Sequence, residues 1–146
     1  MLLTEQPLGR ILSGLGKGYL HLLRTKLQHL DIDRNYYALA LISKHDGEIT
    51  QQELALLLDS DKVSIVRIVD YLSGKGYVQR RHKTDDRRKH SLNLTDKGWL
   101  AIPEIEKSFT ELNNMVLNGF EKSQVAELTQ TINKLKYNIT QNTEFK

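Results

Sequence analysis

Apolar residues recur at helical spacing in six segments of the chain, with short polar breaks between them. The first segment, 8–30, places leucine, isoleucine and tyrosine on one stripe, which predicts a long amphipathic helix. Four glycines in its first half each cost up to about 1 kcal/mol relative to alanine, so packing against another helix must compensate for them. A second helix is predicted from Asp33, which can cap it, to Ile42, and Gly47 follows its end.

Two shorter helices follow. Thr50 and Glu53 fit a capping box that begins the first of them, and this helix breaks just before Asp61. The second starts there and ends at Gly74–Gly76. Its core-facing residues lie at i, i+3, i+4 and i+7: Ile65, Ile68, Val69 and Leu72. Two helices joined by a turn of a few residues and followed by basic sequence indicate a helix-turn-helix.

A β-hairpin and another long helix are predicted after the helix-turn-helix. Residues 77–82 and 89–94 are extended-type segments with a polar, charged run between them, which indicates a hairpin wing. Thr95 caps a helix that ends at Gly119. Because proline removes a backbone donor, Pro103 predicts a kink near Trp99 or a helix start later than Thr95 suggests.

The last apolar segment has spacings of three and four residues, the 3.5-residue period of a helix that packs lengthwise on another helix. Its members are Val125, Leu128, Ile132, Leu135 and Ile139. The whole pattern predicts one domain, 1–146, that is mainly α with a small β wing. Within it, a winged helix-turn-helix lobe occupies 33–96, and long helices flank it in 1–32 and 97–146.

Positive charge is concentrated in one stretch of the chain. Residues 62–90 contain nine Lys and Arg and three Asp, a net charge of +6, so the other residues carry −3 of the total of +3. This concentration is the footprint expected for contact with phosphates. The chain has no cysteine, which excludes disulfides and thiolate metal sites. With no apolar run long enough to cross a membrane and no signal peptide, we expect a cytoplasmic protein.

Catalytic, cofactor and metal motifs are not found. The five histidines are scattered, and no pair has the i, i+4 spacing of metal ligands on a helix. No Ser/His/Asp signature, glycine-rich phosphate loop or paired-carboxylate motif is present either. The sequence therefore predicts a protein that is not an enzyme and that holds no cofactor or metal.

Several segments between Ile49 and Gly98 together resemble the multiple antibiotic resistance regulator (MarR) family of bacterial transcription factors. They are Ile49–Ala55, Arg67–Leu72, Lys75–Arg80, Asp86–Arg88 and Leu94–Gly98. The resemblance implies a triangular homodimer in which the flanking helices of 1–32 and 97–146 form a dimerisation region. It also implies two lobes that straddle a palindromic duplex and a small-molecule cleft between lobe and dimerisation region.

One face of the helix that starts near Asp61 is predicted to read DNA. The residues pointing away from the core are Lys62, Val63, Ser64, Val66 and Arg67. Val63 or Val66 can touch a thymine methyl, while Arg67 or Lys62 donates to guanine or to phosphate. The alternative is that this face is merely solvated or packs on the wing.

The wing arginines, Arg87 and Arg88, are predicted to enter a minor groove, where narrow A·T tracts concentrate negative potential. An ordinary charged turn is the alternative interpretation. By resemblance to the family, Asp86 pairs with Arg88 and orients it, although a surface ion pair of this kind contributes only about 0–1 kcal/mol.

Four aromatic residues are candidates for contact with a ligand: Tyr19, Tyr36, Tyr37 and Trp99. Aromatic residues at helical spacing also serve as core, and this alternative stays open. The sequence thus predicts a homodimeric DNA-binding regulator. The resemblance implies that it is a repressor, which an aromatic or hydrophobic small molecule releases from a palindromic operator. The rivals are an architectural or protein-interaction winged helix without effector control, and a helical protein that binds or converts a small molecule.

Overall fold

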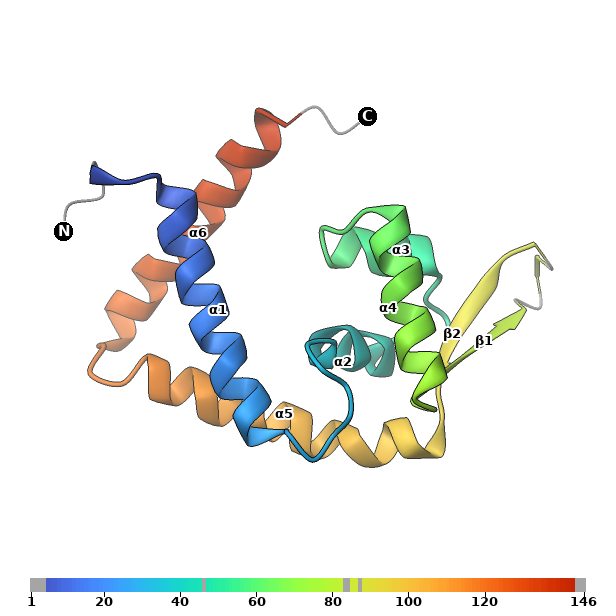
Figure 1. Cartoon of the computed structure of the whole chain (residues 1–146). Helices are drawn as coiled ribbons and strands as arrows, with labels where there is room; N and C mark the ends of the chain where they lie inside the picture. Colours follow the sequence, from blue (N-terminus) through green and yellow to red (C-terminus); the bar gives the residue numbers. More distant parts are fainter. Residues whose placement is uncertain (1–4, 46, 83–84, 87, 144–146) are drawn as a thin grey trace. The chain divides into compact units, whose positions relative to one another are not determined.

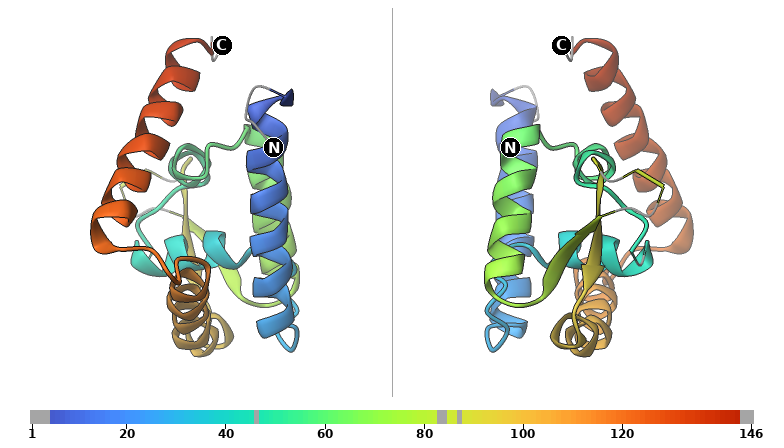
Figure 2. Two further views of the ribbon diagram at one scale, coloured as in Figure 1. Left: turned by 90° about the vertical axis from the view of Figure 1, so that its left-hand side faces the viewer. Right: turned by 90° about the vertical axis from the view of Figure 1, so that its right-hand side faces the viewer.

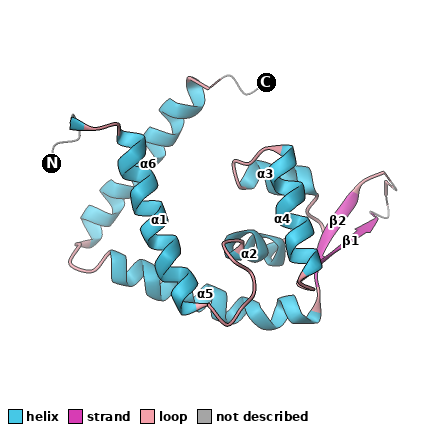
Figure 3. Cartoon of the chain, in the orientation of Figure 1, coloured by secondary structure: helices cyan, strands magenta, loops and turns pink. Residues whose placement is uncertain are grey.

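The computed structural model describes residues 5–45, 47–82, 85–86 and 88–143, and Figures 1 and 3 show its elements. These are α1 (Leu8–Lys26), α2 (Tyr36–Lys44), α3 (Gln51–Leu57), α4 (Lys62–Gly74), β1 (Val78–His82), β2 (His90–Leu94), α5 (Asp96–Val116) and α6 (Lys122–Gln141). The predicted mainly helical fold with a small β wing is confirmed. The chain divides into two compact units, 1–112 and 113–146, each described by itself.

The first helix is shorter than predicted. It ends at Lys26 instead of Leu30, and a turn connects it to α2. Leu27 and Ile32, both in this turn, are fully buried. The amide of Leu30 donates to the carbonyl of Leu27 at 2.9 Å. The apolar spacing extended the predicted helix because a tight turn that buries leucines can have the same spacing as a helix.

The predicted cap of α2 is wrong. Asp33 lies before the helix in a left-handed conformation with φ of 59°, and Asn35 occupies the capping position without a side-chain cap bond. The Asp33 carboxylate instead lies 3.1 Å from the guanidinium of Arg24 on α1. The capping preference of aspartate is thus overridden by an ion pair between residues that the turn brings together. Gly47 has the positive φ of 77° expected after the helix.

The helix-turn-helix forms as predicted. The Thr50 amide donates to the Glu53 carboxylate at 2.7 Å, and the Glu53 amide donates to the Thr50 hydroxyl at 3.2 Å, which completes the capping box of α3. Asp61 caps α4 by accepting the Ser64 amide at 2.7 Å. The predicted inward face of α4 is buried at Ile65, Val69 and Leu72 and partly buried at Ile68.

The hairpin wing is antiparallel, and its register pairs Val78 with Leu94 and His82 with His90. Figure 2 shows it from two sides beside the helices of the first unit. A short extra pairing joins the hairpin to the start of α3, because Leu92 donates to the Ile49 carbonyl at 2.8 Å. The sequence analysis missed this pairing, since an isolated bridge has no periodicity to detect.

The hairpin leads directly into α5, whose first turn packs tightly on it. Thr95 caps the helix as predicted by accepting the Gly98 amide at 3.1 Å. Pro103 lies inside α5, which begins at Asp96, so the alternative of a later start is wrong. Gly98 is buried, and a Cβ atom added there would lie 2.4 Å from the Tyr77 carbonyl oxygen.

The core of the first unit is built from side chains of α1 and the turn after it, α2, the helix-turn-helix, the hairpin and α5. Tyr37 of α2 meets Phe109 of α5 edge to face, with ring centroids 6.3 Å apart. The core therefore fixes α4 and the hairpin against each other through shared buried side chains.

None of the described helices combines the length and the apolar character that a transmembrane span requires.

The second unit consists of the end of α5 and of α6. A capping box begins α6, because the Glu121 amide donates to the Gln124 side chain at 2.8 Å. No described residue of α6 is buried. Leu128 and Ile132 of the predicted apolar seam are 40% and 51% exposed, so much of this apolar face is open to solvent in the part of the chain that the structure describes.

Candidate nucleic-acid interface

The outward face of α4 carries the exposed residues that the sequence analysis assigned to DNA reading. Lys62 and Arg67 are exposed, and Val63 is 63% exposed. No ion pair joins Lys62 or Arg67 to another residue of the described ranges. A guanidinium and an ammonium that have no ion-pair partner in the folded lobe can donate to base edges or phosphates without first breaking an ion pair.

Two of the assigned residues on α4 are less available than the others. Val66 is partly buried and packs against the core. The Ser64 hydroxyl donates to the Asp61 carboxylate at 2.8 Å, so it forms part of the helix cap. Hence Lys62, Val63 and Arg67 are the exposed members of the predicted reading face.

At the wing, Asp86 and Arg88 interact as the resemblance implied. The Asp86 carboxylate accepts the Arg88 amide at 3.0 Å and lies 3.5 Å from its guanidinium Nε. The Arg88 side chain nevertheless remains 93% exposed. Arg87, the second wing arginine of the prediction, lies outside the described residues. Asp86 therefore fixes the backbone at Arg88 and leaves its guanidinium extended into solvent.

Arg80 connects the wing to both helices of the helix-turn-helix, a role that the sequence analysis missed. Its Nε donates to Gln51 Oε1 of α3 at 2.6 Å, and its terminal nitrogen donates to Asp70 Oδ1 of α4 at 2.6 Å. The Arg80 side chain is only 30% exposed. Alternation along β1 places Arg80 on the same face as buried Val78, which is the signal that could have identified it.

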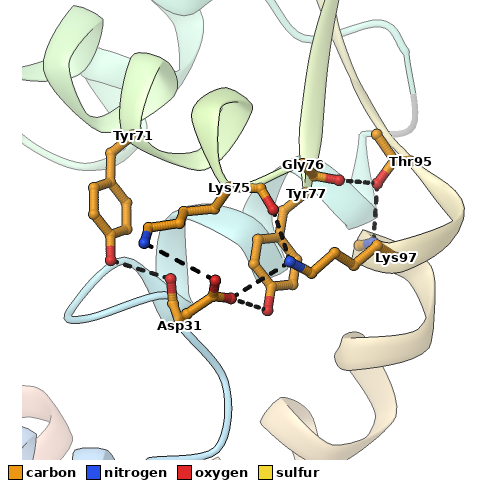
Figure 4. Close-up of polar contacts among 8 residues, drawn as sticks. Asp31, Tyr71, Lys75, Gly76, Tyr77, Thr95 and Lys97 are labelled. Carbon is orange, nitrogen blue, oxygen red and sulfur yellow. Dashed lines mark hydrogen bonds and ion pairs between the residues drawn. The ribbon is translucent and has the colours of Figure 1, made fainter.

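A polar cluster around Asp31 holds the α1–α2 turn against the base of the wing (Figure 4). The Tyr77 hydroxyl donates to the Asp31 carboxylate at 2.7 Å, and Lys97 Nζ lies 3.5 Å from the same oxygen. Lys97 also donates to the Lys75 carbonyl at 2.7 Å and lies 4.3 Å from the centroid of the Tyr77 ring. Tyr71 of α4 donates to the Asp31 backbone carbonyl at 3.1 Å.

Because of these contacts, one carboxylate joins the turn after α1, the end of α4 and the first turn of α5. The Thr95 hydroxyl adds a bond of 2.6 Å to the Gly76 carbonyl. None of the residues in this cluster was singled out for such a role from the sequence, because they are up to 66 positions apart, from Asp31 to Lys97. The cluster positions α4 and the wing relative to α5.

Comparison with known proteins places this arrangement in a family. The family model described as "MarR family" matches residues 34–90, which include α2, α3, α4 and β1. Residues 34–90 are a MarR family domain. The resemblance that the sequence motifs indicated is thereby confirmed.

Solved structures of MarR and SlyA proteins share the fold over nearly the whole chain. The transcriptional regulator SlyA has 19% identity and a TM-score of 0.88, with 96% of this chain and 99% of that chain covered. A MarR variant from E. coli complexed with operator DNA has 27% identity and a TM-score of 0.80, with coverage of 92% and 98%. A MarR family regulator from Listeria monocytogenes complexed with 26mer DNA has 21% identity and a TM-score of 0.84, with coverage of 94% and 91%.

The Asp31 cluster shifts the pKa values of its two central groups. The hydrogen bond from Tyr77, followed by the charges of Lys97 and Lys75, lowers the pKa of Asp31. Burial and then the hydrogen bond to Asp31 raise the pKa of Tyr77 to about 12. Stability from the Asp31 interaction is therefore lost as the pH falls through its lowered pKa, and stability from the neutral Tyr77 is lost as the pH rises from 10 to 12.

Tyr77→Phe is expected to lower stability at pH 7 and to flatten the loss of stability between pH 10 and pH 12. Phenylalanine keeps the buried ring but cannot ionise, so the alkaline loss specific to this phenol disappears. Denaturant unfolding at pH 7, 10 and 12 measures the effect. The matched control is Tyr137→Phe, which alters a tyrosine that is 64% exposed on α6. An equal alkaline slope in the parent and in Tyr77→Phe would contradict the assignment.

Of the four aromatic residues assigned to ligand contact, Tyr36 lines a cavity. It is 2% exposed and forms one wall of a space of about 390 Å³ between the end of α1 and the start of α2. His21, Arg24 and Asp33 also line this space, which makes it polar. Tyr19 packs partly against the core, while Tyr37 and Trp99 are 54% and 41% exposed; none of these three lines this cavity.

Proposed function

We propose that this MarR family protein is a sequence-specific DNA-binding transcriptional regulator. The observation that carries the proposal is the reading face of Lys62, Val63 and Arg67, presented beside an exposed wing arginine, Arg88. A helix of this kind fits the major groove, which is about 12 Å wide, and a hairpin arm reaches the adjacent minor groove. The excess of positive charge in 62–90 suits the phosphates between the two.

The comparisons support DNA as the partner. Two of the proteins that share the fold were solved with DNA, the E. coli MarR variant with operator DNA and the Listeria monocytogenes regulator with 26mer DNA. We infer that the present chain docks on duplex DNA with α4 in the major groove. Such a regulator works where the genome is, which for a bacterial protein is the cytoplasm.

We also propose that the working form is a homodimer that recognises a palindrome. The predicted dimerisation region, 1–32 and 97–146, contains large apolar residues that are exposed in the described part of the chain. Leu12 and Leu15 of α1 are 41% and 68% exposed, and Ile139 of α6 is 61% exposed. A two-fold dimer would cover these faces and present two copies of α4, addressing half-sites about one helical turn apart.

Repression released by a small molecule is the mode of regulation that we propose. The polar cavity beside Tyr36 is the candidate binding site. Arg24 in its lining is already paired with Asp33, so the Tyr36 ring and His21 are the groups offered to an aromatic compound with a polar substituent. The effector must bind the DNA-incompetent arrangement more tightly, because equal affinity for both arrangements shifts no equilibrium. Weakening of operator binding by members of a phenolic panel tests this point.

Arg67→Ala and Arg88→Ala are expected to weaken DNA binding in different ways. If Arg67 makes a bidentate contact with guanine, its loss costs about 1–3 kcal/mol and relaxes the preference at one base pair of each half-site. Loss of Arg88 should weaken binding on most sequences and reduce the salt slope by about one unit for each phosphate contact removed. The measurement is affinity across salt concentrations on an operator selected from a random duplex library.

Circular dichroism and thermal unfolding control for folding, and Lys134→Ala on α6 supplies a matched loss of one positive charge away from the lobe. Unchanged affinity in folded Arg67→Ala and Arg88→Ala dimers would contradict the assignment of both elements. Equal affinity of the parent for every duplex would favour the rival, an architectural winged helix that reads no sequence.

A further inference from the structure

Two histidines face each other across the wing hairpin. His82 of β1 and His90 of β2 are register partners, and their ring centroids lie 4.5 Å apart with an angle of 38° between the ring planes. Both residues are exposed. Their separation of eight positions in the sequence is not a metal-ligand spacing, so only the strand pairing reveals that the two imidazoles are neighbours.

Packing against the core does not explain this pair. Directly paired residues of an antiparallel hairpin share a face, and faces alternate along each strand. Val78 with Leu94 and Arg80 with Leu92 therefore lie on the same face as the histidines. Their side chains reach the core or the helices, whereas the histidine pair lies beyond the buried part of that face.

The spacing of the rings matches that of two imidazoles on one metal ion. With metal–nitrogen bonds of about 2.0–2.1 Å and an angle at the metal of roughly 90–110°, two coordinated rings have centroids roughly 4.5–5.2 Å apart. The observed 4.5 Å lies at the lower end of this range. Cross-strand partners have Cβ atoms about 4.5–5.5 Å apart, a separation at which small side-chain rotations bring both nitrogens to a common ion.

We propose that His82 and His90 bind one divalent transition-metal ion on the wing. Imidazole ligands suit Zn²⁺, Ni²⁺ and Cu²⁺ over the hard ions Mg²⁺ and Ca²⁺. Among the described residues, no group of three or more His, Cys, Asp or Glu side chains could hold a metal ion, so the two imidazoles are its protein ligands and water completes the coordination. An ion with exchangeable water can also accept a phosphate oxygen.

The charged residues around the histidine pair limit its affinity for a metal ion and indicate what the bound ion does. Arg81 and Lys89 are the chain neighbours of the histidines and repel a cation, while Asp85 and Asp86 at the wing attract it. The bound ion adds two positive charges and cross-links the strands at the point where they enter the wing tip. Resting on the proposed function, we infer that it strengthens the contact of the wing with the phosphates of DNA.

Titration of the tag-free chain with Zn²⁺ in a calorimeter tests the site without DNA. One ion per chain is expected for the parent and for the control His29→Ala, an exposed histidine in the turn after α1. Binding to His82→Ala and to His90→Ala should be at least about tenfold weaker, because a single imidazole keeps only half of the protein ligands. Mg²⁺ should give no heat that depends on either histidine.

Equal Zn²⁺ affinity in the parent and both variants would overturn the proposal. One ion per two chains, with the metal itself causing association, would overturn the assignment to one hairpin. Since both substitutions are at exposed positions, unfolding is not expected, and circular dichroism checks this. These outcomes do not depend on whether the protein binds DNA.

Operator binding with and without Zn²⁺ tests the role of the ion. We expect Zn²⁺ to tighten binding by the parent and to steepen its salt slope by roughly one unit, and to do neither in His90→Ala. If Zn²⁺ binds at the pair but DNA affinity does not change, the proposed role of the ion in DNA binding is overturned and the metal site itself stands. Absence of DNA binding by the metal-free parent would contradict the proposed function instead.

Discussion

Gly98→Ala is expected to lower the stability of the protein by about 3 kcal/mol, the cost of forcing an extra methyl group into a packed site. The added Cβ would lie 2.4 Å from the carbonyl oxygen of Tyr77 and 3.3 Å from the side chain of Leu94. The carbonyl belongs to the backbone and already accepts the Thr95 amide at 3.1 Å, so it cannot move aside without breaking that bond. The first turn of α5 must shift instead.

Thermal unfolding at a fixed protein concentration measures this effect, and a loss of about 3 kcal/mol corresponds to a decrease in Tm of roughly 6–12 °C at this chain length. The matched control is Gly74→Ala at the end of α4, where an added Cβ meets no atom within 4 Å. We expect this control to be as stable as the parent or slightly more stable. Equal Tm values for Gly98→Ala and Gly74→Ala would contradict the close packing of α5 on the hairpin.

Because α5 joins the lobe to the rest of the chain, the same substitution should also affect DNA binding. A shift of its first turn displaces Lys97, which holds the Asp31 cluster together. We therefore expect the folded fraction of Gly98→Ala to bind the operator more weakly than Gly74→Ala does. This second readout separates a local rearrangement of the lobe from a general loss of stability.

Glutamine at both Leu128 and Leu135 is expected to convert the dimer to monomer at micromolar concentration. Both residues lie on the apolar seam of α6, a helix with no buried residue in the described chain. In a dimer that covers the seam, each glutamine removes buried apolar area and buries an amide without a hydrogen-bond partner. Both effects weaken the interface, and they act in both copies. A weakening of about 1.4 kcal/mol already raises the dimer dissociation constant tenfold.

Sedimentation across a concentration series measures the dissociation constant of the dimer, and operator affinity is measured on the same samples. We expect the dimer fraction and the operator affinity to fall together, because two linked lobes bind a palindrome more tightly than one lobe does. The matched control places glutamine at Ala126 and Asn133, which lie on the opposite side of α6 from the seam. A well-folded parent monomer at micromolar concentration, or an unchanged dimer in the doubly substituted seam variant, would contradict the proposed dimerisation region.

Local sequence signals determined most of the secondary structure of this protein. The capping box of Thr50 and Glu53 fixed the start of α3, and Asp61 fixed that of α4, because each cap involves residues only three positions apart. The 3.6-residue period of α4 identified its buried and exposed faces, and thereby Lys62, Val63 and Arg67 as surface residues. The pairing of Asp86 with Arg88 was expected from the resemblance to the family, not from a local signal.

Where local signals compete with distant contacts, the predictions from the sequence were wrong. Asp33 has the side chain of a helix cap, yet it pairs with Arg24, which reaches it only because the chain turns after α1. The helix predicted from the apolar stripe extended through Leu27 to Leu30, beyond the end of α1, because the leucines of this turn have the same spacing as leucines on a helix. In both cases the tertiary arrangement differs from the local preference, because the turn after α1 brings distant residues together.

Only the tertiary structure could assemble the contacts that position the candidate interface. Arg80 reaches Gln51 and Asp70 across 29 and 10 positions, and Tyr77 reaches Asp31 across 46. His82 and His90 became neighbours through the strand register, which no spacing along the chain specifies. The sequence by itself determined which residues are charged, apolar or capping over one or two turns, because those preferences are local. Which of them meet was decided by the burial of a shared core, a property of the whole chain.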